Sequence, residues 1–170
     1  MKIIRNVLSE NLLSDCIDEL RSELTEERWR TNLLNWDSTL FRGGINGSCL
    51  ARHASSDIRS RVINEIEKYI PQSDRIEVAF YCWQPQSGIA LHNDGDKVFG
   101  ATIYLNYEWD VNDGGLFVWW SLESGKWEVA VPEQNVMIIN DSAEDHMVTS
   151  VSPSPSDFRY SLQIWGLEGL

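Results

Sequence analysis

The sequence predicts an all-β core with N-terminal helices, folded as a jelly roll (a double-stranded β-helix) of about eight strands with the helices packed on one sheet. Two observations predict this fold class. Apolar residues recur with a helical period over roughly the first 70 residues, and the period changes to two from Arg75 onward. Turn sequences then separate the alternating segments at short intervals.

Two helices are expected in the N-terminal half. The apolar stripe of the first recurs every four positions, at Leu8, Leu12, Cys16, Leu20 and Leu24. Ser9 can cap its start. The second helix is expected from about Asp57 to Ile70, capped by Ser56 and closed by Pro71. Segment 29–53 carries turn signals and is expected to be loop with some short structure.

The strands of the core follow from the alternating segments. They are expected at 75–82, 89–93, 98–106, 116–120, 126–131, 135–140, 146–151 and 158–166. Turn chemistry separates them, as in Asn93–Asp96 and Ser152–Pro155. We expect one domain over 1–170, with 1–74 as a helical support and 75–170 as the jelly-roll core.

Composition excludes several classes of protein. The net charge of −12 and the lack of a basic stripe argue against a nucleic-acid partner. No apolar run reaches the roughly 20 residues that span a membrane, and the first six residues show no signal peptide. Three scattered cysteines argue against a disulfide framework or a structural zinc site. Together these features favour a cytoplasmic protein.

The two faces of the strands differ in kind. One face is apolar, whereas the other carries Tyr, Thr, Ser, Gln and one Arg in place of the Lys and Glu that are usual in solvent. We therefore expect the polar faces to point into the sandwich around a pocket and the apolar faces to take the helices. This places four side chains inward: Tyr81, Tyr104, Arg159 and Ser161.

A candidate metal site is formed by His92, Asp94 and His146. Residues two apart in an extended segment point the same way, and His146 begins a later strand. Two imidazoles and one carboxylate occupy one face of an octahedral ion, which is typical of iron(II) oxygenases. The alternative is a simple turn with a packed His92. Asp96 is a rival ligand, and His53 is the remaining histidine, with an expected surface or supporting role.

Arg159 and Ser161 form a second candidate group, because residues two apart share a face. A guanidinium can hold a carboxylate through two parallel hydrogen bonds, and the hydroxyl adds another. An unpaired arginine inside a barrel is costly. It is therefore expected to meet either a ligand carboxylate or, in the alternative, a protein carboxylate in an internal salt bridge.

The motifs also come in a characteristic order. They are Val78–Tyr81 with Gly88 and His92–Asp94, then Ala101–Asn106 with Trp109–Asp110 and Gly114–Leu116, then Val131–Pro132, Asn135 and His146–Val151, and finally Arg159–Trp165. This set, over about residues 75–166, resembles the iron(II)- and 2-oxoglutarate-dependent dioxygenases, specifically the prolyl 4-hydroxylase-like branch. The loop before His92 is about one residue longer than in the family pattern.

The resemblance implies roles for these residues. The metal ligands and catalytic centre for Fe(2+) would be His92, Asp94 and His146. Arg159 and Tyr104 would bind the distal carboxylate of 2-oxoglutarate, Ser161 would assist them, and Tyr81 would lie near the co-substrate or substrate. O2 would be the oxidant, with ascorbate as a further candidate cofactor.

The implied reaction is hydroxylation of a C–H bond with release of succinate and CO2. Halogenating relatives lack the carboxylate that Asp94 supplies, while desaturation or ring formation stays open. The substrate would be a small molecule or an amino acid, free or peptidyl, with Trp83, Arg42 and Trp119 as candidate contacts. Two alternatives are a cupin-like metal enzyme that does not use 2-oxoglutarate and a non-catalytic jelly-roll binding module.

Overall fold

The computed structural model describes residues 1–22, 30–31 and 49–169. The helices are α1 (Glu10–Ser22), α2 (Ser56–Ile66) and a short 3-10 helix (Val111–Asp113). The strands are β1 (Lys2–Arg5), β2 (Arg30–Thr31), β3 (Cys49–His53), β4 (Arg75–Trp83), β5 (Ile89–His92), β6 (Phe99–Tyr104), β7 (Phe117–Ser121), β8 (Lys126–Ala130), β9 (Val136–Asn140), β10 (His146–Val148) and β11 (Arg159–Leu167).

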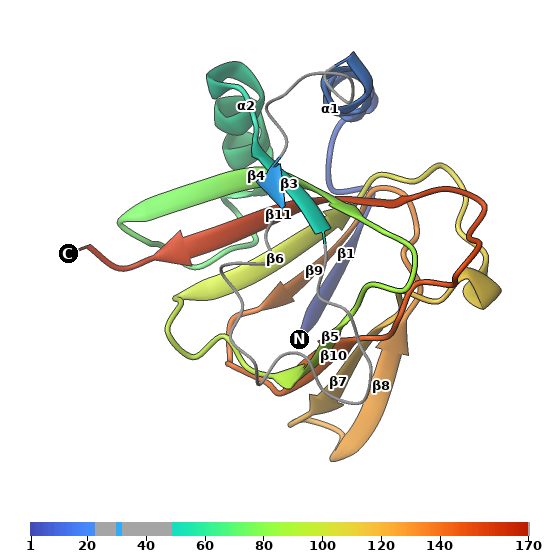
Figure 1. Ribbon diagram of the computed structural model, residues 1–170. Helices are drawn as coiled ribbons and strands as arrows, with labels where there is room; N and C mark the ends of the chain where they lie inside the picture. The colour runs from blue at the N-terminus through green and yellow to red at the C-terminus, as the bar shows by residue number, and fades with distance from the viewer. Residues whose placement is uncertain (23–29, 32–48, 170) are drawn as a thin grey trace.

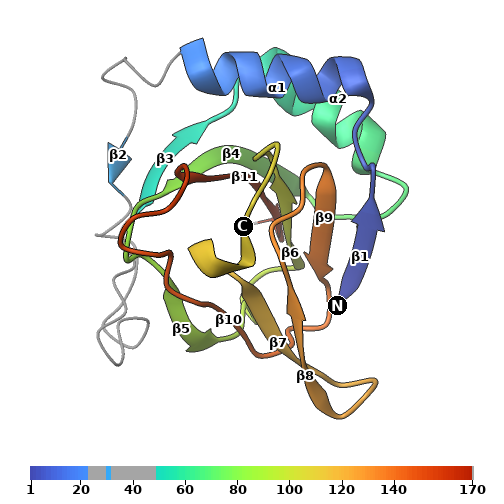
Figure 2. The same ribbon diagram turned by 90° about the vertical axis from the view of Figure 1, so that its right-hand side faces the viewer.

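Within these ranges the strands form two antiparallel sheets. The larger sheet has the order β1-β9-β6-β11-β4-β3-β2, and the smaller has the order β5-β10-β7-β8. The smaller sheet lies below the larger one (Figure 1), and both helices lie together on the far side of the larger sheet (Figure 2). The predicted fold class, a jelly roll with helices on one sheet, is confirmed.

The helices are held by the apolar face of the larger sheet. Leu12 of α1 and Val62 of α2 are almost fully buried in one cluster with Phe80, Ile103 and Leu162 of the sheet. Burying each such side chain contributes about 1.5–3 kcal/mol. Because this apolar face is occupied by the helices, the opposite face of the same strands is the one that meets the smaller sheet.

The chain before residue 75 is not only a helical support. β1 pairs with β9, and β3 pairs with β4, so this segment extends the larger sheet at both of its edges. Neither strand was predicted from the sequence. β1 is only four residues long, and three of them are exposed, so alternation over it is too short to distinguish a strand from a loop.

The second helix begins one residue earlier than predicted and ends sooner. Ser55, not Ser56, is the N-cap, and its hydroxyl accepts a hydrogen bond from the backbone N–H of Ile58 at 3.2 Å. The Ser55 hydroxyl also donates to Glu19 at 2.6 Å, which ties the helix start to α1. Regular helix ends at Ile66 rather than at Ile70.

Replacing Ser55 with alanine should therefore lower the free energy of unfolding by about 1 kcal/mol, because a capping hydrogen bond is lost. The matched control is Ser56→Ala, one residue along and already inside the helix, which should change it by less than about 0.5 kcal/mol. Urea unfolding of the three proteins measures both values. Equal losses at the two positions would contradict the assigned cap.

All three cysteines are buried, and none of them forms a disulfide. Burial raises the pKa of Cys16 and that of Cys82 to about 12, in each case with a smaller contribution from nearby carboxylates. At pH 8 these thiols are protonated and shielded from reagents. We expect less than one thiol to react rapidly with Ellman's reagent in the native protein and all three to react in denaturant; a fast native thiol would contradict the burial.

None of the helices that the structure describes is both long enough and apolar enough to cross a membrane.

Candidate active site

A cavity of about 620 Å³ lies between the two sheets. The polar face of the larger sheet lines it, through residues that include Glu77, Tyr81, Thr102, Arg159 and Gln163. The inward direction predicted for this face is thus confirmed. Tyr104 belongs to the apolar cluster between the sheets, and Ser161 pairs with it across β6 and β11.

The smaller sheet brings the three predicted metal ligands into this cavity. His92 ends β5, His146 begins β10, and these two residues are paired across the strands. Asp94 Oδ2 lies 3.3 Å from Nε2 of His146, and Asp94 Oδ1 lies 3.7 Å from Nε2 of His92. One potential ligand atom from each residue falls within 4.8 Å of the others, and no other such group of three occurs in the described ranges.

Hydrogen bonds determine which nitrogen of each imidazole is free. Nδ1 of His92 lies 2.8 Å from the carbonyl oxygen of Ala90, and Nδ1 of His146 lies 2.9 Å from that of Glu144. A carbonyl only accepts, so each Nδ1 carries the proton and each Nε2 keeps its lone pair. Both lone pairs belong to the nitrogens that lie beside Asp94. This is the arrangement that a metal ion requires.

The ionisation states also suit a metal. Burial, with a contribution from His146, lowers the pKa of His92 and favours the neutral ring. Burial alone would raise the pKa of Asp94, but the neighbouring side chains of His146 and His92 hold it below the usual range. A neutral imidazole and an ionised carboxylate are the forms that bind divalent cations.

Local turn chemistry positions Asp94. The side-chain oxygen of Asn93 accepts from the N–H of Gly95 at 3.3 Å, and the carbonyl of Asp94 accepts from the N–H of Lys97 at 2.9 Å. Gly100, on β6 opposite, leaves the space that the carboxylate occupies. A Cβ at this position would lie 3.3 Å from Asp94 Oδ2 and 2.8 Å from the ring of Trp165.

The remaining candidates for the metal do not join this cluster. Asp96 lies at the cavity but is mostly exposed and pairs with Lys97. It is not part of the three-residue group. His53 is exposed at the end of β3. The choice of Asp94 over Asp96 therefore agrees with the geometry.

Arg159 lines the same cavity and is only 1% exposed. Its guanidinium carbon lies 5.0 Å from the centre of the Tyr104 ring and 5.3 Å from that of Trp83. In the described part of the chain no carboxylate pairs with it, so the alternative of an internal salt bridge is not observed there. Burial lowers the pKa of Arg159, which reflects the cost of an uncompensated charge.

Unsatisfied polar atoms gather around this arginine. Nε of Arg159, the hydroxyl of Tyr104 and the hydroxyl of Ser161 are all buried and have no hydrogen-bond partner within the described ranges. Such atoms are rare in folded proteins, and each calls for an explanation such as an absent ligand. A buried cation and a metal-type cluster line the same cavity, which suits a ligand that carries two carboxylates.

Gly115 explains how Arg159 reaches this place. It has φ +60°, and a Cβ here would lie 2.7 Å from Cδ of Arg159. Glycine therefore provides both the left-handed backbone and the space for the arginine stem. This is the second glycine of the Gly114–Leu116 segment quoted above.

The three candidate substrate contacts differ in their placement. Trp83 lines the cavity. Trp119 is 3% exposed and packs against Phe117 in the apolar cluster between the sheets, so it does not belong to the lining. Arg42 lies outside the described residues.

Sequence reasoning did not single out Gln163 or Asn140, which also line the cavity. Gln163 shares the inward face with Arg159 and accepts a hydrogen bond from Thr102 at 2.8 Å, so alternation could have identified it. Asn140 ends β9 and had no comparable signal.

Comparisons with known proteins agree with this geometry. The model of the 2OG-Fe(II) oxygenase superfamily matches residues 67–166. No curated protein sequence matches the chain significantly.

Solved structures with the same fold include a prolyl-4-hydroxylase from Pseudomonas putida, with a TM-score of 0.71, 15% identity, and coverage of 99% of this chain and 92% of that one. A prolyl hydroxylase from Trichoplax adhaerens, in complex with a peptide of the hypoxia-inducible factor, has a TM-score of 0.69 and 17% identity, with coverage of 98% of this chain and 83% of that one. The epimerase SnoN, in complex with Fe3+, alpha ketoglutarate and nogalamycin RO, has a TM-score of 0.67 and 14% identity, with coverage of 98% of this chain and 78% of that one.

These identities show the fold alone, whereas the superfamily model covers more than half of the chain. The chain therefore belongs to the 2OG-Fe(II) oxygenase superfamily and is an iron(II)- and 2-oxoglutarate-dependent oxygenase.

Proposed function

We propose that this enzyme hydroxylates a C–H bond of a small molecule or an amino acid, free or peptidyl, and releases succinate and CO2. In this proposal His92, Asp94 and His146 hold the iron. Arg159 and Tyr104 bind the distal carboxylate of 2-oxoglutarate. Ser161 assists this contact, and Tyr81 lines the cavity beside it.

The observation that carries the proposal is that the buried Arg159 has no carboxylate partner among the residues that the structure describes. A buried guanidinium without a carboxylate partner is unstable. Here it lies in the same cavity as a cluster with the ligand set of an iron(II) oxygenase. A dicarboxylate that reaches both groups would neutralise the arginine and satisfy the hydroxyl of Tyr104. A cupin-like enzyme that does not use 2-oxoglutarate would leave these buried groups unsatisfied.

The iron would supply the oxidising chemistry, and the protein would supply geometry and exclusion of water. The Nδ1–H bonds to Ala90 and Glu144 would fix both imidazole rings. Asp94 would fill the position that a halide needs, which favours hydroxylation over halogenation. Trp83 would shield the arginine from solvent through its ring.

The proposed size of the substrate rests on the cavity. A volume of about 620 Å³ is in the range of sites for small ligands. The wall of the cavity contains both polar and apolar side chains, which include Glu77, Gln163 and Trp165 in addition to the metal cluster. Similar folds hold a peptide in one solved structure and nogalamycin RO in another, so both free and peptidyl substrates belong in the first screen.

The test is an anaerobic titration of the iron(II)-loaded protein with 2-oxoglutarate. A weak visible charge-transfer band should develop as the co-substrate chelates the metal. Iron binding without this band would overturn the proposal. Next, a metabolite extract and a panel of amino acids and peptides are screened for succinate production in air. If the band forms but no candidate raises succinate above the uncoupled rate, a binding module is favoured instead.

We also propose that the protein works in a reducing cytoplasm. The support is that none of Cys16, Cys49 and Cys82 forms a disulfide, as is usual in reducing compartments. Fractionation of the source cells, with an antibody against the protein, tests this assignment. Recovery from a secreted or oxidising fraction would contradict it.

A further inference from the structure

Three buried asparagines share one pattern of side-chain hydrogen bonds to the backbone. Asn106, Asn135 and Asn140 are each between 4% and 8% exposed. In each, the side-chain oxygen accepts from a backbone N–H and the side-chain nitrogen donates to a backbone carbonyl. Each amide therefore holds a separate piece of backbone at two points, like a clamp.

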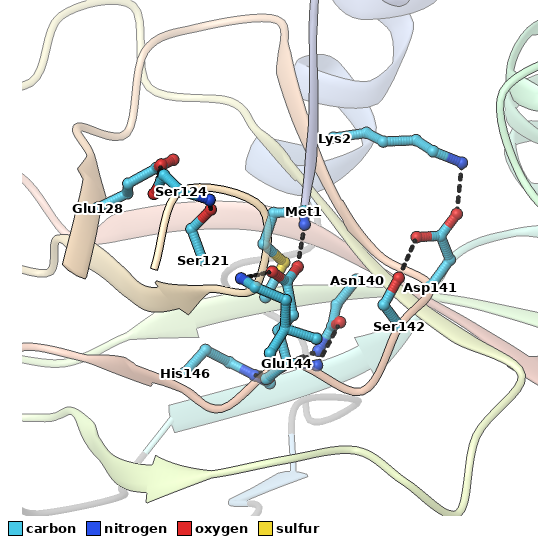
Figure 3. Close-up of polar contacts among 11 residues, drawn as sticks. Met1, Lys2, Ser121, Ser124, Glu128, Asn140, Asp141, Ser142, Glu144 and His146 are labelled. Atoms are coloured by element: carbon cyan, nitrogen blue, oxygen red, sulfur yellow. Dashed lines mark hydrogen bonds and ion pairs between the residues drawn. The ribbon is translucent and has the colours of Figure 1, made fainter. Parts of the chain in front are cut away.

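The clamp of Asn140 acts on the turn that carries His146. Asn140 Oδ1 accepts from the N–H of Glu144 at 3.0 Å, and Nδ2 donates to the carbonyl of Glu144 at 3.2 Å. The same carbonyl accepts from Nδ1 of His146 at 2.9 Å. Figure 3 shows Asn140 and His146 on either side of Glu144, joined to it by these contacts.

Glu144 is held by its carboxylate as well. This group accepts from the N–H of Leu122 at 2.8 Å and pairs with the amino group of Met1 (Figure 3). The carbonyl that determines the tautomer of His146 thus belongs to a residue fixed on several sides. Asn140 additionally lines the cavity, and its Nδ2 lies 3.3 Å from Nδ1 of His146.

The clamp of Asn106 acts on Arg159. Asn106 Nδ2 donates to the carbonyl of Phe158 at 2.8 Å, and its Oδ1 accepts from the N–H of Tyr160 at 2.7 Å. These two residues flank Arg159. The backbone on both sides of the arginine is therefore fixed by one side chain, at the point where β11 begins.

Asn135 directs the same side-chain clamp at Leu8, although its own backbone N–H donates to the carbonyl of Tyr104 at 2.9 Å. Its oxygen accepts from the N–H of Leu8 at 2.9 Å, and its nitrogen donates to the carbonyl of Leu8 at 2.8 Å. Leu8 belongs to the cluster under the helices. Asn135 also has φ +58°, which alanine tolerates poorly. Its replacement therefore costs at least as much stability as that of the other two.

We infer that Asn140 and Asn106 are positioning residues with separate targets: Asn140 orients His146 toward the metal, and Asn106 orients Arg159 toward the co-substrate. The inference rests on the proposed function. Loss of a residue that supports a metal ligand typically lowers the affinity of the site for the metal by about 10–100-fold. Because the two clamps lie on different elements, their losses should affect different ligands.

The experiment compares Asn140→Ala, Asn106→Ala and Asn135→Ala by calorimetry, with Mn2+ as a redox-stable probe of the metal site. 2-Oxoglutarate affinity is measured at saturating Mn2+, and the melting temperature of each metal-free protein is recorded. Asn140→Ala should weaken Mn2+ binding by about 10–100-fold and leave 2-oxoglutarate binding unchanged. Asn106→Ala should weaken 2-oxoglutarate binding and leave Mn2+ binding unchanged. Asn135→Ala should lower only the melting temperature.

The serine variants at the same positions repeat the comparison if an alanine variant fails to fold, because serine keeps a polar group but cannot reach both backbone partners. Equal changes in both affinities across the three positions, or changes in melting temperature alone, would overturn the inference. Wild-type protein that binds neither probe would overturn the proposed function instead, so the two failures are distinguishable.

Discussion

His146→Ala should abolish the 2-oxoglutarate charge-transfer band and reduce succinate production by more than about 100-fold, the upper range for the loss of a merely supporting residue. The reason is that Nε2 of this ring is one of three proposed ligand atoms within 4.8 Å. The two ligands that remain, His92 and Asp94, are too few to hold iron(II) at micromolar concentration. The measurement is anaerobic iron titration followed by succinate assay.

His53→Ala is the matched control for this prediction. His53 is exposed at the end of β3 and is not one of the three clustered residues, so its loss should leave iron affinity, the band and turnover unchanged. The metal-free His146→Ala protein should remain folded, although the stacking of this ring on Phe117 is lost. Iron affinity that survives in His146→Ala would contradict the proposed ligand set.

Much of this site could be predicted because strand alternation encodes direction. Residues two apart share a face, so the alternation in strands 75–82 and 158–166 is enough to direct Tyr81 and Arg159 inward, as the structure has them. The order of the motifs then related His92 to His146, which are 54 positions apart in the chain but paired across β5 and β10. Local periodicity and a family pattern together supplied both ends of the cavity.

Two properties of the site could not be predicted from the sequence: how far a side chain reaches into the cavity, and which groups it meets there. Trp83 and Trp119 are both nearly buried tryptophans on strands, yet only Trp83 reaches the cavity. Alternation predicts the face of the strand from which a side chain projects. It does not predict whether the ring lines the cavity or packs beneath its wall. Similarly, an arginine on an inward face could have met a protein carboxylate. Which carboxylates lie nearby is a property of the assembled sheets.

Arg159→Met should produce two opposite effects. The binding free energy of 2-oxoglutarate should weaken by about 2–5 kcal/mol, because a buried charged partner of the ligand is lost; this corresponds to a loss of affinity of roughly 30- to 4,000-fold. The metal-free protein should meanwhile become more stable, by about 1–4 kcal/mol, since a buried charge that has no carboxylate partner among the described residues is replaced by an apolar side chain of similar length. Calorimetric titration at saturating Mn2+ and urea unfolding measure the two quantities.

A gain of stability with a loss of affinity would indicate that the protein keeps Arg159 for a ligand and not for its own fold. Arg52→Met provides the contrast, because Arg52 is similarly buried but forms an ion pair with Glu19 at 3.4 Å. Removing it breaks this ion pair at a buried site, so stability should fall while 2-oxoglutarate affinity is retained. If Arg159→Met instead destabilises the metal-free protein as Arg52→Met does, Arg159 has a structural partner, and the main argument for a dicarboxylate site is lost.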